Sequence, residues 1–296
     1  MPSSRRDFSG LWIPLITPFT RDAGDAVDHP ALTRLVKHYA AAGVSGFVAC
    51  GSTGEAAALD KTEQLAVLDT VLAAAGALPV IMGLSGYHLG HTIAWVKELA
   101  ERPIAGVLVP PPHYIRPAQA GLVQWFTALA NASDKPLVIY DIPYRTGATI
   151  TLETLLTLAA HPNIQAIKDC GGDAGTTQAL VTDRRLQVLA GEDAQIFSTL
   201  ALGGAGAIAA CAHVCTAQFV EVMRLLQQGE LQGARTQWQP LAPLVSAVFA
   251  EPNPAVIKAV LAQQGLIQDG LRLPMMAASA GATERLLAAM AHVTAV

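Results

Sequence analysis

Residues 136–169 read PLVIYDIPYRTGATITLETLLTLAAHPNIQAIKD. Two short apolar runs, 136–140 and 164–168, enclose a longer segment of helical pattern. This succession is typical of two buried parallel strands joined by a right-handed crossover helix. The same unit recurs along the chain, with further apolar, β-branched runs at 11–17, 44–50, 78–82, 104–109, 186–190 and 207–211.

Eight such units predict a closed (β/α)8 barrel, an α/β fold of the TIM-barrel type. An open, doubly wound sheet is the alternative, but no Gly-x-Gly-x-x-Gly sequence follows the first run. The residues after the eighth unit have helical or turn-like patterns interrupted by prolines. We therefore expect a catalytic barrel over residues 1–228 and a C-terminal helical region over 229–296 that packs on it.

The composition excludes several classes of protein. Hydrophobic residues make up 52% of the 296 residues and charged ones 14%, which is sufficient for a large core and argues against disorder. The formal net charge of −4 argues against a surface for nucleic acid or an anionic membrane. Because no apolar segment follows the N-terminal arginines, we expect no signal peptide and a cytoplasmic protein.

The cysteines and histidines give little sign of a metal. The four cysteines are too few and too scattered for a disulfide framework. The sequence CAHVC at 211–215 lacks the spacing and the second ligand pair of a structural zinc site, so it is interpreted as a buried strand end. His88 and His91 are interpreted as a surface pair at the start of a helix.

In a barrel of this kind the catalytic groups follow the carboxyl ends of the strands. The ends that carry polar or ionisable residues read CGSTGE at 50–55, PPPHYIRP at 110–117, YDIPYRTG at 140–147, IKD at 167–169 and GED at 191–193.

Among the lysines, Lys168 alone closes an apolar strand at this end of the predicted barrel. A buried ammonium is costly unless it is paired or deprotonated, so we predict an amine of lowered pKa that attacks a carbonyl and forms a Schiff base. The alternative is a lysine paired with Asp169 or Glu192. Lys135 precedes a strand at the opposite end. The remaining lysines fall in helical patterns, where a solvated face is expected: Lys37, Lys61, Lys97 and Lys258.

Neighbouring residues favour the Schiff base. Tyr140 ends the adjacent strand and could transfer protons to and from a carbinolamine. Ser52 and Thr53 lie in a glycine-rich turn that leads to a helix, where hydroxyl and amide groups bind a carboxylate. Arg145 offers a bidentate fork for a second carboxylate. Each residue has an ordinary structural explanation, but together with Lys168 they predict a site for a 2-oxo acid.

These motifs resemble those of the dihydrodipicolinate synthase and N-acetylneuraminate lyase family of Schiff-base (β/α)8 lyases. The resemblance covers essentially the whole chain and is closest to the synthase branch. The motifs that carry it are GSTGE at 51–55, YDIPYRTG at 140–147, IKD at 167–169, GED at 191–193, LGGAGAI at 202–208, EPNP at 251–254 and LRLP at 271–274.

The resemblance implies a role for each catalytic position. Lys168 forms the imine with pyruvate, and Tyr140 is the acid and base. Thr53 relays the proton of Tyr140 to Tyr114, which a neighbouring subunit contributes in this family. A homo-oligomer, most simply a tetramer, is therefore expected. The imine itself supplies the electron sink, so neither a cofactor nor a metal is expected.

The resemblance also implies binding roles. Ser52 and Thr53 hold the pyruvate carboxylate, and the backbones of Gly191 and Ile208 line the pocket. Arg145 binds the carboxylate of the second substrate, and the sialic-acid lyases of the family lack this arginine. The expected reaction is the condensation of pyruvate with L-aspartate 4-semialdehyde in lysine biosynthesis.

Three departures from the family pattern concern the acceptor. Asp141 stands where the synthases usually have Asn, and Tyr144 replaces a small residue before the arginine. His113 replaces the first tyrosine of a Tyr–Tyr pair. These changes leave two alternatives open: a pyruvate-dependent aldolase or dehydratase acting on a sugar acid or a 4-hydroxy-2-oxo acid, and a non-catalytic oxo-acid-binding protein.

Regulation by lysine is not expected. In lysine-inhibited synthases the allosteric site uses polar and acidic residues at positions that here are occupied by Ala56, Lys61, Tyr87, His91 and His113. The Glu and the Asn that would hold the charged groups of lysine are absent from these positions. The alternative is a rebuilt site in which Glu55 or another acidic residue compensates.

Overall fold

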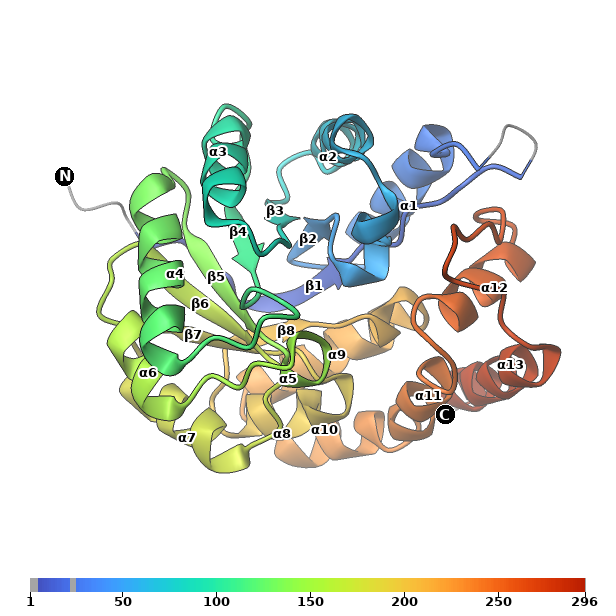
Figure 1. Cartoon of the computed structure of the whole chain (residues 1–296). Helices are drawn as coiled ribbons and strands as arrows, with labels where there is room; N and C mark the ends of the chain where they lie inside the picture. Colours follow the sequence, from blue (N-terminus) through green and yellow to red (C-terminus); the bar gives the residue numbers. More distant parts are fainter. Residues whose placement is uncertain (1–4, 22–24, 296) are drawn as a thin grey trace. The chain divides into compact units, whose positions relative to one another are not determined.

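The computed structural model describes residues 5–21 and 25–295. Eight strands form a closed barrel in the order of the sequence, which confirms the predicted (β/α)8 fold (Figure 1). The strands are β1 (Gly10–Pro14), β2 (Gly46–Ala49), β3 (Val80–Gly83), β4 (Gly106–Val109), β5 (Leu137–Asp141), β6 (Ile164–Asp169), β7 (Gln187–Ala190) and β8 (Gly206–Ile208).

Helices follow the strands in alternation, and β5 is followed by an additional short helix, α5. The helices are α1 (His29–Ala41), α2 (Lys61–Ala74), α3 (Leu89–Leu99), α4 (Gln119–Ala132), α5 (Pro143–Thr146), α6 (Leu152–Leu158), α7 (Ala174–Asp183), α8 (Ile196–Ala201), α9 (Thr216–Gln227), α10 (Leu231–Trp238), α11 (Leu241–Val248), α12 (Ala255–Gln263) and α13 (Ala280–Ala295). Short 3-10 helices are η1 (Ser52–Gly54), η2 (Ala56–Ala58), η3 (Asp193–Gln195) and η4 (Cys211–His213).

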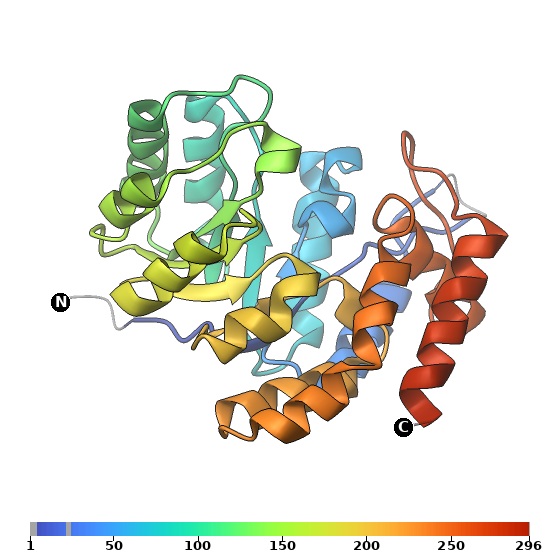
Figure 2. The same cartoon turned by 90° about the horizontal axis from the view of Figure 1, so that it is seen from below.

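Contacts between Cα atoms divide the chain into two compact units. Of the described residues, 5–10 and 79–208 form the first unit, in which β3 to β8 pair in parallel, each with the next. The described residues of 11–78 and 209–295 form the second, in which β1 pairs with β2. Within the second unit α10 lies beside α9, and α13 beside α11 (Figures 1 and 2). The boundary at residue 228 stays a prediction.

Local sequence explains where the helices begin. Asp60 precedes α2 and accepts a hydrogen bond from the N–H of Glu63, whose carboxylate accepts one from the N–H of Asp60. This capping box satisfies two amide groups that a helix start leaves without partners. His88 caps α3 by accepting from the N–H of His91, and both side chains are exposed. The prediction of a surface pair at a helix start is therefore confirmed.

Most of the CAHVC segment is buried, but residues 211–213 form η4 and are not a strand end as predicted, and Cys215 is only partly buried. His213 is buried, its Nε2 accepts a hydrogen bond from the N–H of Ile16 at 3.2 Å, and its Nδ1 lies 2.8 Å from the carbonyl oxygen of Ala210. Burial lowers the pKa of His213 to about 4, so the ring is neutral. Within residues 5–21 and 25–295, no cluster of three metal-ligating side chains is found, and no helix is long and apolar enough to cross a membrane.

Candidate active site

Lys168 and Tyr140 occupy matching positions near the carboxyl ends of two hydrogen-bonded strands. Lys168 in β6 is in register with Tyr140 in β5, so both side chains leave the same face of the sheet. The Nζ of Lys168 lies 4.3 Å from the centroid of the Tyr140 ring, and both residues are buried. A primary amine and a phenol are thus held together away from bulk water.

The charge state of Lys168 differs from the expectation. Burial disfavours its ammonium form, but the neighbouring Tyr140, Cys170 and Asp193 favour it, and the net effect raises the pKa of Lys168 above its ordinary value. The prediction of a lowered pKa is wrong for the unliganded site, because the sequence did not reveal these compensating groups. The amine must lose a proton before it can attack a carbonyl.

Asp169 does not form the pair with Lys168 that the alternative interpretation of this lysine requires. Its carboxylate accepts hydrogen bonds from the Thr177 hydroxyl at 2.6 Å and from the N–H of Gly171 at 2.9 Å. These contacts fix the start of the β6–α7 loop, so the carboxylate that follows Lys168 serves the loop.

Gly191 directly follows β7 and makes space for the lysine side chain. A Cβ atom at this position would lie 2.6 Å from the Sγ of Cys170 and 2.6 Å from the Cγ of Lys168. The backbone N–H of Gly191 donates to the carbonyl oxygen of Asp169 at 2.8 Å, which ties β7 to β6 at the level of the site. Any side chain here would displace Lys168 or Cys170.

Asp141 is a buried carboxyl group next to this centre. It is in register with Asp169, and only 3% of its surface is exposed. Burial, reinforced by the charge of Asp169, raises the pKa of Asp141 to about 7, although a backbone hydrogen bond at Ile150 opposes the shift. Within the described residues its Oδ1 has no hydrogen-bond partner. This group therefore titrates near neutral pH, where the Asn of the family pattern would not.

Arg145 and Tyr144 lie on α5, which begins at Pro143 after β5. Both side chains are exposed, and the Arg145 guanidinium carbon lies 5.9 Å from the centroid of the Tyr144 ring. Desolvation by the surrounding atoms, with the nearby Cys170 and Tyr140, raises the pKa of Tyr144 to about 12, although the hydrogen bond and charge of Arg145 oppose the shift. The bulky ring of Tyr144 thus stands beside Arg145, the residue predicted to bind the acceptor.

Tyr114 and Ile208 take contrasting positions in the first unit. Tyr114 is 87% exposed, in a loop after β4 where its own φ is 76°. Ile208 is the last residue of β8 and is fully buried. The contribution of Tyr114 to a neighbouring subunit stays a prediction.

Ser52 and Thr53 belong to the second unit, in the turn between β2 and α2. Ser52 is exposed, whereas Thr53 is 3% exposed and its Oγ1 accepts a hydrogen bond from the Nδ2 of Asn253 at 2.9 Å. A Cβ atom on Gly54 would lie 2.8 Å from the carbonyl oxygen of Leu15, so this glycine is required for the turn to pack closely.

Sequence reasoning missed how the C-terminal region contacts this turn. In the sequence, Asn253 stands out only as part of the EPNP motif, and the helical pattern around Lys258 predicts a solvated face. Lys258 is instead completely buried and forms an ion pair with Glu55. The available signal was its setting in the run VIKAVL at 256–261, where apolar residues surround the lysine on all sides of the helix.

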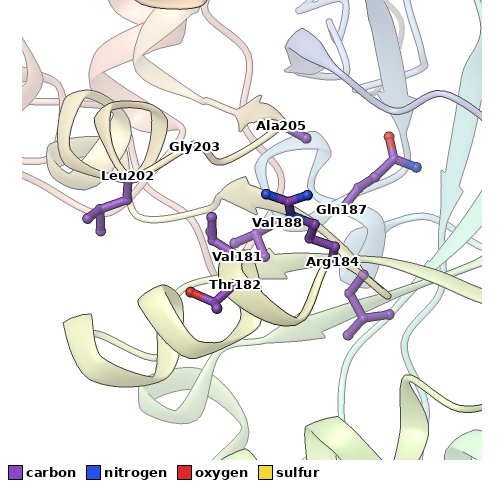
Figure 3. Close-up of a pocket in the computed structure, with 9 residues that line it drawn as sticks. Val181, Thr182, Arg184, Gln187, Val188, Leu202, Gly203 and Ala205 are labelled. Carbon is purple, nitrogen blue, oxygen red and sulfur yellow. The ribbon is translucent and has the colours of Figure 1, made fainter.

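A separate hollow of about 520 Å³ lies at the other end of the strands in the first unit (Figure 3). It involves Gln187 and Val188 at the start of β7, Arg184 after α7, and Gly203 before β8. Because Lys168 pairs with Leu189 and Gly191 follows the end of β7, this hollow is not the site of the predicted chemistry.

Comparisons with known proteins agree with the motifs. The model of the dihydrodipicolinate synthetase family matches residues 7–293. Two curated relatives are named 4-hydroxy-tetrahydrodipicolinate synthase. The protein of Sorangium cellulosum is 38% identical over 99% of this chain and 98% of its own, and that of Limosilactobacillus fermentum is 40% identical over 95% and 90%.

Solved structures show the same relationship. The chloride-inhibited dihydrodipicolinate synthase of Acinetobacter baumannii, solved in complex with pyruvate, superposes with a TM-score of 0.92. It is 30% identical, and the match covers 97% of this chain and 99% of that one. The chain belongs to the dihydrodipicolinate synthetase family of (β/α)8 lyases.

Proposed function

We propose that this lyase condenses pyruvate with L-aspartate 4-semialdehyde, the reaction of a 4-hydroxy-tetrahydrodipicolinate synthase in lysine biosynthesis. The observation that carries the proposal is the placement of the Lys168 Nζ 4.3 Å from the Tyr140 ring centroid at the ends of paired strands. The names of the curated relatives support the choice of reaction.

Lys168 performs the covalent chemistry. Its neutral amine attacks the 2-oxo carbon of pyruvate, and the resulting carbinolamine loses water to give an imine. Tyr140 supplies the proton that lets the hydroxyl leave and takes a proton back in the next step. Loss of a methyl proton from the imine gives an enamine, whose carbon forms the new bond with the aldehyde carbon of the acceptor.

The remaining predicted residues bind and shield the substrates. Ser52 and Thr53 hold the pyruvate carboxylate, and Arg145 holds the carboxylate of the acceptor through its planar fork. Gly191 and Ile208 line the pocket with their backbones. The imine withdraws electrons as a metal would in other aldolases, so neither a metal nor another cofactor is needed.

The active form is proposed to be a cytoplasmic homo-oligomer, most simply a tetramer. Tyr114 is 87% exposed in one chain, as a residue that completes the site of a neighbouring subunit would be. Thr53 would then pass a proton between Tyr140 and Tyr114.

A coupled assay with pyruvate and aspartate semialdehyde tests the reaction. Turnover that depends on both substrates and is lost in Lys168→Ala is expected. The second candidate, an aldolase acting on a sugar acid or a 4-hydroxy-2-oxo acid, is favoured by the bulk of Tyr144 beside Arg145. Faster turnover with such an acceptor than with aspartate semialdehyde would establish it instead.

A further inference from the structure

The turn that carries Ser52 and Thr53 has an unusual backbone. Cys50 before it and Glu55 at its end both have a φ of 52°, in the left-handed region that residues other than glycine rarely adopt. Such conformations persist where the surrounding structure holds them in place. All the contacts described below lie within the second unit, the described residues of 11–78 and 209–295.

Lys258 of α12 holds Glu55 from the C-terminal region. Its Nζ forms an ion pair with the Oε1 of Glu55 and donates a hydrogen bond to the carbonyl oxygen of Gly270 at 2.8 Å. The same nitrogen lies 4.2 Å from the centroid of the Phe19 ring. The three N–H groups of the ammonium thus have a carboxylate, a carbonyl and an aromatic face as neighbours.

Arg272 contacts both Glu55 at the end of the turn and Glu63 in α2, the helix that follows the turn. Its backbone N–H donates to the Oε2 of Glu55 at 3.2 Å, and its guanidinium forms two hydrogen bonds with Glu63 at 2.7 and 2.6 Å. The guanidinium carbon lies 4.5 Å from the centroid of the same Phe19 ring. Both oxygens of Glu55 are therefore engaged by the C-terminal region.

Asn253 reaches the catalytic part of the same turn. Its Nδ2 donates to the Oγ1 of Thr53 at 2.9 Å, so the hydroxyl hydrogen of Thr53 must point elsewhere and is available for donation. Contacts from residues 253–272 thus hold the turn at two positions, Thr53 and Glu55.

We propose that the Glu55–Lys258 ion pair positions the Ser52–Thr53 turn for pyruvate, which makes the C-terminal region part of the binding site. A buried ion pair contributes little net stability, because desolvation offsets the attraction, whereas an unpaired member is strongly unfavourable. The pair is therefore better explained by the geometry that it imposes. This inference rests on the proposed function, in which the turn binds the pyruvate carboxylate.

The test measures the pyruvate concentration that gives half-maximal borohydride trapping at Lys168. Glu55→Gln and Lys258→Met each leave one buried charge unpaired. Each should raise that concentration at least tenfold (~1.4 kcal/mol), while the adduct at saturating pyruvate stays at one per chain. In Glu55→Gln/Lys258→Met no charge is left unpaired, so its effect should be smaller than the product of the two single effects.

Arg224→Met is the matched control, because it removes an exposed ion pair with Glu221 in the same unit and should leave half-saturation unchanged. Irreversible loss of folded protein would lower the number of trappable sites without shifting half-saturation, and urea unfolding of each variant shows whether its folded fraction in buffer is close to one. If the single variants do not fold, Glu55→Asp retains the charge but shortens its reach, and should still raise half-saturation.

The outcomes separate the two proposals. If the folded Glu55 and Lys258 variants reach half-maximal trapping at the same pyruvate concentration as the unaltered protein, the positioning role is overturned. No adduct in the unaltered protein overturns the proposed function itself.

Discussion

The amine of Lys168 and the ring of Tyr140 face each other across two paired strands, with Nζ 4.3 Å from the ring centroid. The same neighbourhood raises the pKa of Lys168, so at neutral pH the resting enzyme holds an ammonium ion. The chemistry of this family begins with the neutral amine. The step that forms the imine should therefore be sensitive to pH.

Trapping with pyruvate and borohydride should attach one reduced pyruvate to Lys168, at a rate that increases with pH. While the amine is mostly protonated, its neutral fraction rises about tenfold per pH unit, so the rate should increase steeply between about pH 6 and 9. Mass spectrometry of peptides at each pH measures both position and rate. An adduct on another lysine, or a rate that falls over this range, would contradict the assignment.

Substitution of Gly191 by alanine should disable the same lysine. The added Cβ would lie 2.6 Å from atoms of both Cys170 and Lys168, so one of these side chains must move. We expect a loss of stability of ~1–3 kcal/mol and little trapping by pyruvate. In the control Gly233→Ala, the new Cβ meets its nearest atom at 3.5 Å and lies in a helix, where alanine is favoured. That variant should trap normally.

Asp141 should make the stability of the protein depend on pH. Its pKa is raised to about 7 in the folded protein, so between about pH 4 and 7 the folded state binds more protons than the unfolded chain. The free energy of unfolding should therefore decrease as the pH rises through this range. Asp141→Asn removes the buried charge, and should increase stability by ~2–4 kcal/mol at pH 8 with little effect near pH 4.

Urea unfolding at the two pH values measures this difference. Asp183→Asn serves as a control, because the pKa of the half-buried Asp183 is lowered by its hydrogen bond to Arg185. Its replacement should leave stability at pH 8 unchanged or slightly lower. A lower stability of Asp141→Asn at pH 8 would contradict the raised pKa of Asp141, because it would mean that the folded protein stabilises the charged carboxylate.

The fold and the central residues could be predicted because they depend on local patterns. Apolar runs of strand length alternate with helical segments, and only one lysine closes such a run, so barrel and nucleophile both follow from the sequence. Lys168 and Tyr140 were also predictable as neighbours, since consecutive parallel strands pair and their ends meet.

The surroundings of these residues depend on contacts between distant parts of the chain. The pKa of Lys168 is set by its burial, which lowers it, against Tyr140, Cys170 and Asp193, which raise it, and no residue pattern gives that balance. Lys258 appeared in a helical pattern as an ordinary lysine, because its partner Glu55 lies about two hundred positions earlier in the sequence. A charged residue can be recognised as buried and paired only when the positions of both partners in space are known.

L-Lysine should not inhibit the enzyme. Ala56 and Lys61 occupy two positions of the family's allosteric site, and the ammonium of Lys61 would repel lysine. Of the others, Tyr87 and His113 contact each other edge to face with centroids 5.4 Å apart, and the His91 ring stacks on that of His88. Loss of a charge partner costs several kcal/mol (~3–5), enough to abolish useful affinity. Calorimetric titration with L-lysine beside the activity assay decides the point, and saturable binding with loss of activity would refute it.

Mixing two inactive variants should restore activity if Tyr114 completes a neighbouring subunit's site. Lys168→Ala has no nucleophile, and Tyr114→Phe should reduce turnover by about 10²–10⁴-fold. In a mixed dimer, the subunit that carries the Tyr114→Phe substitution keeps Lys168 and receives an intact Tyr114 from its partner. One of the two sites is then complete, so random reassociation at equal amounts should recover about a quarter of the full activity. Sedimentation should show at least a dimer, whereas a fully active monomer, or no recovery after proven subunit exchange, would contradict the crossed tyrosine.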